Sequence, residues 1–264
     1  MEPKQIPYHL AESPDGEQRW KHGRTRFVPP ADLFDPKRAS VVPLDEGDAK
    51  ALVCAHHYSH SYPAARFRTG LTLKDRLGVE RLVGVAVFGL NMQQEASMRK
   101  YLGVAPEEGV ELSRLVLLPE ALFNAETYFL GRSFRLLKAA LPEVKGILSY
   151  CDPIARHDAE GNETKRGHTG MIYRAHNANY LGRSGARTHT LTTDGRLVSE
   201  RMVSKLRNGE RGAGYAYRTL LALGAPPRRP LEADDDYVER AMKEGPFKKA
   251  RHPGNLIFTW KWAA

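Results

Sequence analysis

The sequence predicts an α/β (α+β) protein in which a sheet of several strands is covered by helices. A branched apolar run at residues 81–89, RLVGVAVFG, is typical of a buried strand. Residues 66–74 also have strand character, and the turn DRLGVE between the two runs predicts an antiparallel hairpin. Residues 111–138 have the pattern of a buried strand followed by an amphipathic helix. The expected order is strand–helix–strand–strand–strand–helix–strand–helix–strand.

Length and composition set the general class of the protein. The 264 residues suffice for one large domain with extensions. Lys and Arg number 40 against 31 Asp and Glu, a formal charge of +9 that favours a polyanionic partner such as nucleic acid. The chain has only two cysteines, which are too few for a disulfide framework or a cysteine-rich zinc site. No stretch has the apolar length of a membrane span or a secretion signal, so we expect a cytoplasmic protein without membrane contact.

The N-terminal part contains a predicted extension and a histidine-rich helix end. Residues 1–40 are rich in Pro and basic residues and are expected to form a basic extension. Asp45 is expected to cap a helix that ends in CAHHYSHSYP. There, His56 and His60 lie four residues apart, a spacing that on one helical face could suit a metal, although the Glu of the HExxH pattern is absent. A hydrogen-bonding or substrate-facing role is the alternative.

The central segment 111–138 is predicted to form a strand followed by a helix. Its apolar strand stops at Pro119, and Asn124 is expected to cap the following helix through its side-chain oxygen. The unpaired N–H groups of such a helix start could bind an anionic group, while a plain core strand and helix is the alternative. Before this segment, Gly84 and Gly89 suit close backbone approach or a bulge, and residues 90–110 are expected to be an irregular connection.

The second half of the chain begins with a predicted strand at residues 146–152, which ends at Asp152, a candidate base. A polar surface loop, a short helix at 169–177, a strand near Tyr180 and a hairpin with an Asp194–Gly195 turn should follow. Helices and loops occupy the region after residue 200, before a final strand LIFTWKW. The expected domains are therefore residues 1–40, a core at 41–199 and a basic helical extension at 200–264.

Basic residues are dense in this C-terminal extension and could neutralise DNA phosphates, although solvated helix faces have the same composition. The candidate DNA-binding residues are Arg99, Lys100, Arg201, Lys205, Arg207, Arg211, Lys248, Lys249 and Arg251. The oligomeric state stays open at this point, with a homodimer as one candidate.

Several motifs together resemble the Mom DNA-modification proteins of phage Mu and related phages. They are HYSHSYP, VGVAVFG, ELSRLVLLP followed by N-x-x-T-x-F-L-G-R-S, SYCDP and HTGMIYRAHNANYLG, and they span roughly Val41 to Ser199. The resemblance implies an offshoot of the N-acetyltransferase (GNAT) fold, with a mixed, mainly antiparallel central sheet, splayed in the middle, and helices on both faces. It also implies transfer of a carbamoylmethyl (acetamido) group to the exocyclic amine of adenine in double-stranded DNA, which protects bacteriophage DNA from host restriction.

The resemblance implies an active site as well. On the matching motifs it places Arg114, Asp152 and Tyr173 in the site, with Thr127 where family members often carry Ser. His57 and Tyr58 fall on a motif associated with iron dependence, and Tyr58 is also a candidate to stack on an extruded adenine. An Fe2+ site would favour imidazole and carboxylate ligands, so His60 or Asp152 could complete one with His57. The small molecule that donates the group is not identified.

One departure from ordinary acetyltransferases concerns acetyl-CoA. Those enzymes carry a Gln/Arg-x-x-Gly-x-Gly/Ala pyrophosphate loop, whereas the corresponding turn, PEALFNAETYFLG, has no glycine before Gly131. Such a turn is a poorer cradle for the coenzyme A pyrophosphate, so acetyl-CoA is the weaker cofactor candidate. This departure disfavours the first alternative, an acyl-CoA-dependent acyltransferase acting on a protein or small-molecule amine. The retained Arg114, Asp152 and Tyr173 disfavour the second, a non-catalytic DNA-binding module.

Overall fold

The computed structural model describes residues 34–75, 77–122 and 124–262. Most of the predicted N-terminal extension, residues 1–33, lies outside this range. The chain divides into two compact units. We call the first the sheet unit; it comprises the described residues up to 153, residues 168–183 and the chain from 255 onward. The second, the helical unit, comprises residues 154–167 and 184–254.

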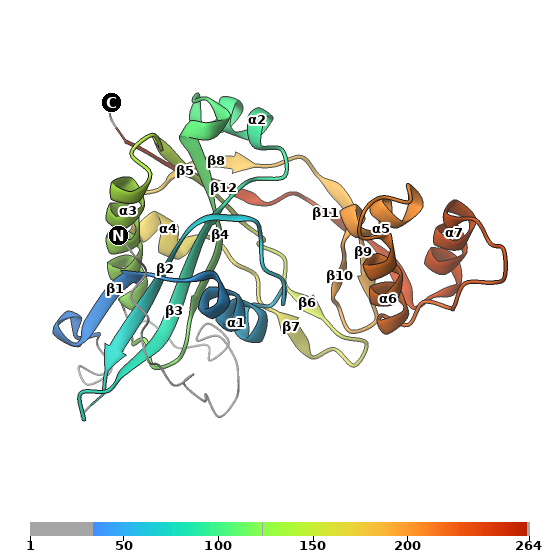
Figure 1. Cartoon of the computed structure of the whole chain (residues 1–264), viewed down its shortest axis with the longest axis horizontal. Coiled ribbons are helices and arrows are strands. Elements are labelled where there is room, and N and C mark those ends of the chain that lie inside the picture. The colour runs from blue at the N-terminus through green and yellow to red at the C-terminus, as the bar shows by residue number, and fades with distance from the viewer. Residues whose placement is uncertain (1–33, 76, 123, 263–264) are drawn as a thin grey trace. The chain divides into compact units, whose positions relative to one another are not determined.

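The sheet unit is built on a seven-stranded sheet in the order β1-β2-β3-β4-β5-β12-β8 (Figure 1). Only β4 and β5 are parallel, and every other pair is antiparallel. The predicted mixed, mainly antiparallel sheet is thus confirmed, as is the hairpin of β2 and β3. The strands are β1 (Ala39–Pro43), β2 (Ala65–Lys74), β3 (Glu80–Gly89), β4 (Gly109–Leu117), β5 (Gly146–Cys151), β8 (Asn179–Arg183) and β12 (Leu256–Lys261).

Helices cover both faces of this sheet because its central strands alternate apolar residues between two cores. Val85 and Val87 of β3 pack with Leu52 and Val53 of α1 (Glu46–His56), in one apolar cluster. Residues 86 and 88 pack in the other cluster, with α3 (Ala125–Ala140). Helices on both faces are therefore confirmed.

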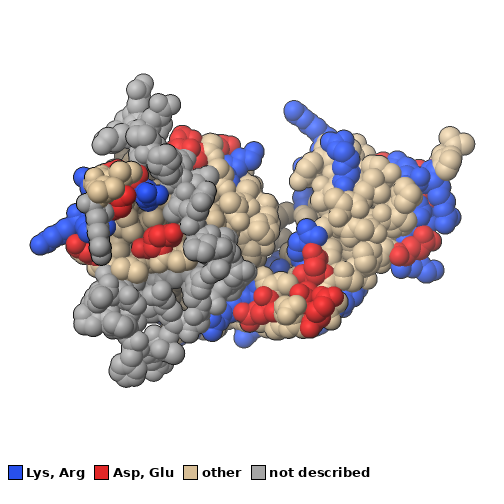
Figure 2. Space-filling view, turned by 90° about the horizontal axis from the view of Figure 1, so that it is seen from below, with Lys and Arg blue, Asp and Glu red and all other residues tan. Residues whose placement is uncertain are grey.

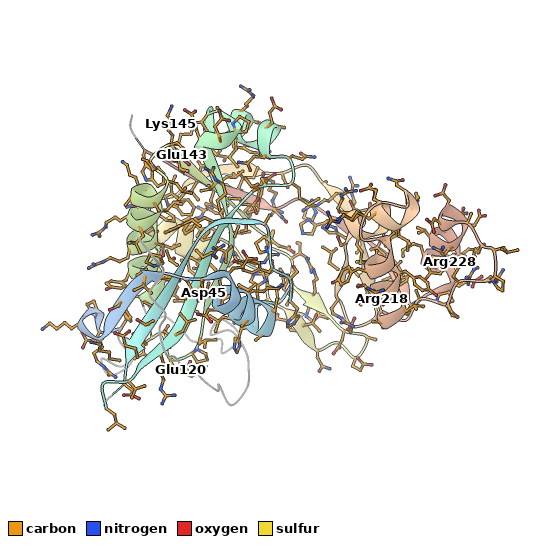
Figure 3. The ribbon with its side chains drawn as sticks, viewed as in Figure 1. Asp45, Glu120, Glu143, Lys145, Arg218 and Arg228 are labelled. Atoms are coloured by element: carbon orange, nitrogen blue, oxygen red, sulfur yellow. The ribbon has the colours of Figure 1, made fainter. Side chains whose placement is uncertain are left out.

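Of the two predicted helix caps, the one for α1 is confirmed and the one for α3 is wrong. Asp45, labelled in Figure 3, accepts a hydrogen bond from the backbone N of Asp48 at 3.0 Å, as predicted for the cap of α1. The prediction that Asn124 caps α3 with its side chain is wrong. Asn124 has φ of 71°, and its side chain makes no cap hydrogen bond. Its left-handed backbone directs the chain into the helix instead.

The strands β4 and β5 are joined at one end and separate at the other. Their parallel pairing covers only residues 109–111 of β4 and 146–148 of β5. At the joined end, Lys145 forms an ion pair with Glu108, and Glu143 pairs with Arg66 at 2.7 Å; Figure 3 labels Glu143 and Lys145. Beyond Glu111 the ladder stops, so the splay implied by the family resemblance is confirmed.

The connection at residues 90–110 contains helical turns, so the prediction of an irregular segment is wrong. The turns are α2 (Gln94–Ser97), the π-helical η4 (Met98–Leu102) and the 3-10 turn η5 (Pro106–Glu108), while η3 (Pro36–Arg38) precedes β1. Apolar contacts explain them, because Met98 and Leu102 are buried in a cluster with β5 and β12. The short helix expected at 169–177 is present as α4 (Met171–Ala175). No helix in the described part of the chain is long and apolar enough to cross a membrane.

The helical unit has its own core between a three-stranded sheet, β10-β9-β11, and three helices. The Asp194–Gly195 hairpin turn is confirmed, with φ of 76° at Gly195. Two further features differ from the expectations. Residues 154–167, predicted as a loop, contain a β6–β7 hairpin, and the basic segment FKKARH forms a strand against β9. The elements are β6 (Arg156–His157), β7 (Glu163–Lys165), β9 (Arg187–Thr192), β10 (Leu197–Val198), α5 (Glu200–Arg207), α6 (Ala213–Ala222), α7 (Asp234–Glu244) and β11 (Phe247–His252).

Candidate active site

Arg114 lies on β4, beyond the last residue pair that joins β4 to β5. Its guanidinium donates hydrogen bonds to two atoms of Ser61, the carbonyl oxygen and Oγ, each at 3.1 Å. A third bond goes to the carbonyl of Ser113 at 2.7 Å. Ser61 belongs to the histidine-rich loop that follows α1, so Arg114 fastens this loop to the sheet. A guanidinium has five N–H donors, so bonds to a ligand are still available to it.

A β-bulge determines which face of the sheet Arg114 occupies. Glu111 and Arg114 are three residues apart, and in a regular strand such residues point to opposite faces of the sheet. Here Arg114 pairs with Val87, while Leu112 pairs with Phe88, so Ser113 is an extra residue. The bulge therefore turns Arg114 to the α1 face, where Glu111 also lies opposite Gly89. A carboxylate and a guanidinium thus share one face of β4 where the sheet opens.

Glu111 is partly buried and belongs to a polar network. Asn91 Nδ2 donates to its Oε2, and Asn91 Oδ1 accepts from Ser97 Oγ at 3.1 Å. Burial raises the pKa of Glu111, and the hydrogen bond from Asn91 and the charge of Arg114 offset only part of that increase. Sequence reasoning missed this residue, although a carboxylate inside the run VELSRLVLL was the signal that could have identified it.

Tyr173 approaches the splay from the opposite face of the sheet. It lies on α4 in the α3-side core and is only 5% exposed. Its ring makes edge contacts with Phe258 and Trp260, at centroid distances of 5.6 and 5.2 Å. Burial raises the pKa of the Tyr173 phenol above its usual value, and charge on Cys151, and to a smaller extent on Tyr58 and Glu111, raises it further, while a hydrogen bond with Ser149 lowers it. Groups from the two faces therefore influence one another where β4 and β5 separate.

The loop after α1 supplies Tyr58 and two of the predicted metal ligands. The ring of His57 lies against that of Tyr58, with 4.3 Å between centroids. His57 Nδ1 accepts from the backbone N of Ser59 at 3.1 Å. The phenol of Tyr58 and the carboxylate of Glu111 favour the charged form of Arg114, while burial lowers the pKa of Arg114. We call Tyr58, Arg114, Glu111 and Tyr173 the splay group, because charge on Tyr58 and on Glu111 raises the pKa of both Arg114 and Tyr173.

The predicted sharing of a helical face by His56 and His60 is wrong. The helix α1 ends at His56, and His60 has a left-handed backbone with φ of 45°. Its Nδ1 lies 2.9 Å from the carbonyl of Cys54. Among the described residues, no group of three or more His, Cys, Asp or Glu side chains could hold a metal ion. The iron site at His57 and His60 stays a prediction, and these residues as placed do not form a full ligand set.

Two further residues of the predicted active site, Asp152 and Thr127, lie after β5 and on the first turn of α3. Asp152 follows β5, is 8% exposed, and accepts a hydrogen bond from the backbone N of His168 at 2.8 Å on its carbonyl. It lies four residues beyond Leu148, the partner of Glu111 on β5, and thus about 13 Å along the strand direction from that pair. Thr127 lies on the first turn of α3, where its Oγ1 donates to the Asn124 carbonyl at 3.2 Å. No described hydrogen bond ties Thr127 to Arg114 or Tyr173.

The candidate DNA-binding residues divide between the two units. In the sheet unit, Arg99 pairs with Glu95 at 3.3 Å, and Lys100 lies over the ring of Tyr101. In the helical unit, Lys205, Arg207 and Arg211 belong to α5 or the turn after it, while Arg201 is held by Glu210 through two hydrogen bonds. The β11 basic residues, all exposed, are Lys248, Lys249 and Arg251.

The visible surface of the helical unit carries both signs of charge. Figure 2 shows Lys and Arg side chains on it with Asp and Glu among them. Several charged side chains of the helical unit are paired within it, as in Arg228–Asp234 at 2.5 Å and Arg240–Glu232 at 2.6 Å. Net charge therefore overstates the cations available to a polyanion, and the exposed strand β11 is the stronger candidate surface.

Comparison with known proteins identifies one family. The model of the Mom protein family matches residues 38–221. No curated protein matches the chain. Among solved structures, malonyl-CoA decarboxylases from Rhodopseudomonas palustris and Agrobacterium vitis are each 10% identical and have TM-scores of 0.36 and 0.35. Each match covers 87% of this chain, which spans 61% and 62% of the respective decarboxylase chains.

A tandem GNAT protein from the clavulanic acid biosynthesis pathway is also similar, with 8% identity and a TM-score of 0.40. That match covers 86% of this chain and 99% of the tandem protein. TM-scores of this size do not support an inference about activity. The family match, in contrast, extends from η3 through most of α6 and contains every residue of the splay group.

Proposed function

The chain belongs to the Mom protein family, and from this premise we propose that it is a transferase that modifies adenine in double-stranded DNA. The group added is a carbamoylmethyl group on the exocyclic amine, and the modified DNA resists restriction by a host. The family match over residues 38–221 carries this proposal. The splay group supports it, since four side chains suited to binding and proton transfer lie within the matched region.

The chemistry of adenine defines what the site must supply. The lone pair of the exocyclic amine is delocalised into the ring, so the amine is a weak nucleophile. A base has to take its proton, and the donor of the group has to be activated. The guanidinium of Arg114 suits the second task, because it can donate hydrogen bonds to a carbonyl or carboxylate oxygen of the donor.

The tyrosines have complementary roles in this proposal. A duplex adenine is stacked and must be extruded before its amine can react. Tyr58 is partly exposed and can stack on the extruded base. Tyr173 is a protonated phenol at neutral pH, and its raised pKa favours this form further, so it acts as a hydrogen-bond donor. Asp152, at the end of β5, is the base candidate that the family resemblance implies.

DNA binding is assigned to exposed cations outside this group. The β11 basic residues lie on a strand at the edge of the three-stranded sheet, where their side chains can reach phosphates. Arg207 and Arg211 are exposed as well. Phosphate contacts of this kind position the duplex without reading its sequence.

Mass spectrometry of nucleosides tests the proposal. DNA from cells that express the wild-type protein is digested to nucleosides and compared with DNA from cells that carry an empty vector. We expect a deoxyadenosine in which a carbamoylmethyl group replaces one hydrogen. The variant Arg114→Gln should abolish it, while Arg132→Gln, a matched change on the exposed side of α3, should leave it. Absence of this modified nucleoside from the wild-type sample would refute the proposal.

A further inference from the structure

We propose that Glu111 is a catalytic residue of this site: it is the base that accepts the proton of the adenine amine when the new bond forms. This inference rests on the proposed function and assigns the role of the base to Glu111 in place of Asp152. The position of Glu111 supports it first. Glu111 is the last residue of β4 paired with β5, so its side chain lies where the two strands begin to separate. The bulge at Ser113 places Arg114 on the same face.

The groups that interact with Glu111 through a hydrogen bond or through its charge come from four segments. Arg114 comes from β4, Tyr150 from β5, Tyr173 from α4 and Asn91 from the connection before α2. Arg114 is the cation among them, while the two tyrosines are neutral phenols whose pKa values burial raises further. Burial raises the pKa of Glu111 above its usual value, and the hydrogen bond from Asn91 and the charge of Arg114 lower it only in part.

The opposing effects on the pKa of Glu111 differ from those on a carboxylate with a purely structural role. A carboxylate retained for stability is normally held ionised by cations and N–H donors, which lower its pKa. Glu111 has a guanidinium and an amide beside it, yet burial outweighs them. A carboxylate with a raised pKa is the stronger base, and such perturbation gathers at functional sites. Glu111 therefore combines the location, the cationic neighbour and the basicity that the reaction needs.

The proposed step balances in atoms and electrons. The adenine nitrogen uses its lone pair to form a bond to the methylene carbon of a donor that carries a carbamoylmethyl group and a leaving group. The bond from that carbon to the leaving group breaks, and its electron pair departs with the leaving group. The proton lost by the nitrogen passes to the carboxylate of Glu111, which later releases it to solvent. Arg114, on the same face, can hold the carbonyl oxygen of the donor.

Asp152 is the other candidate for the base, and it lies at a different position along the strands. The register places Asp152 about 13 Å along β5 from the residue paired with Glu111. A base must come within about 3 Å of the nitrogen whose proton it accepts. The backbone positions of the two carboxylates therefore differ, and variants of each residue discriminate between the two candidate bases.

The experiment measures the rate of adduct formation in lysates of expressing cells, with added plasmid DNA, between pH 5 and pH 8. Glu111→Gln, Glu111→Asp and the matched variant Asp152→Asn are compared with wild type. We expect Glu111→Gln to lower the rate by about 100-fold to 10,000-fold, the usual contribution of a positioned base. Glu111→Asp should regain at least tenfold over the glutamine variant, since it restores a carboxylate.

The pH profile distinguishes a base from a structural residue. The wild-type rate should fall as pH decreases, because protonation removes the base, and this acid limb should be absent from the residual rate of Glu111→Gln. Tryptophan fluorescence during urea unfolding checks that each variant is folded. A Glu111→Gln rate within threefold of wild type, no regain in Glu111→Asp, or an acid limb lost only in Asp152→Asn would overturn the inference. Wild-type adduct must appear in the same assay, so failure of the proposed function is recognised separately.

Discussion

Replacement of Gly170 by Ala should destabilise the sheet unit and reduce adduct formation. Gly170 is the cap residue before α4, and its φ of 75° lies in the left-handed region that favours glycine. A Cβ atom at this position would overlap the ring of Phe258. That ring is fully buried and held between Tyr173 and Tyr180, with centroid distances of 5.6 and 5.4 Å, so it has little freedom to move away.

Two physical terms give the size of the effect. A non-glycine residue in the left-handed conformation costs about 1–2 kcal/mol. Forcing extra atoms into a packed core costs about 1–3 kcal/mol. Together they predict a loss of about 2–5 kcal/mol in the free energy of unfolding of the sheet unit. Any shift of Phe258 is passed to Tyr173, which is why the rate of adenine modification should fall as well.

Gly103→Ala is the matched control. Gly103 has φ of 70°, and a Cβ built there meets no atom within 4 Å, so this variant tests the backbone term alone. It should lose about 1–2 kcal/mol. The assay is urea unfolding followed by tryptophan fluorescence, because Trp260 and Trp262 both belong to the sheet unit. Equal losses in the two variants would show that the ring overlap does not matter and would refute the steric account.

Three further predictions concern the helical unit. Tyr237→Phe should leave its stability unchanged or raise it by up to about 2 kcal/mol in urea unfolding followed by circular dichroism, because the buried Tyr237 hydroxyl has no partner among the described residues; a clear loss would contradict this. Glu232 has its pKa lowered to about 2 by hydrogen bonds from Arg240, so stability should fall as pH decreases from 4.5 toward 2, and Glu232→Gln should flatten that dependence. Alanine at all three β11 basic residues should lower the slope of log K against log salt by up to about 2.7 in DNA titrations, and an unchanged slope would exclude β11 as a phosphate-binding surface.

Local sequence signals predicted much of the fold. The β2–β3 hairpin followed from two strand-like runs around a turn, and the start of α1 followed from the capping side chain of Asp45. These signals act over a few residues, so they survive in the tertiary structure. The sequence also predicted β12 from its apolar run, although it could not show that this strand inserts between β5 and β8.

The wrong predictions concern places where distant contacts decide the local structure. The segment FKKARH has no apolar alternation, and it becomes the strand β11 because β9 offers a partner more than fifty residues away in the sequence. Asn124 and His60 both adopt left-handed backbones where the chain changes direction. The capping pattern assumes an extended backbone at Asn124, and the four-residue spacing assumes that the helix continues to His60, whereas α1 ends at His56.

The bulge on β4 explains why the composition of the site was only partly predictable. The resemblance implied Arg114 and Tyr173, but a period of two along the strand would separate Glu111 and Arg114 onto opposite faces. One extra residue, Ser113, brings them onto the same face, and the end of the β4–β5 ladder opens the sheet beside them. Both features depend on pairing with neighbouring strands, which a single sequence does not specify. A carboxylate that looked like an isolated polar residue in a core strand thereby comes onto the same face as the guanidinium, and the base role that we propose for it depends on sheet geometry and not on any motif.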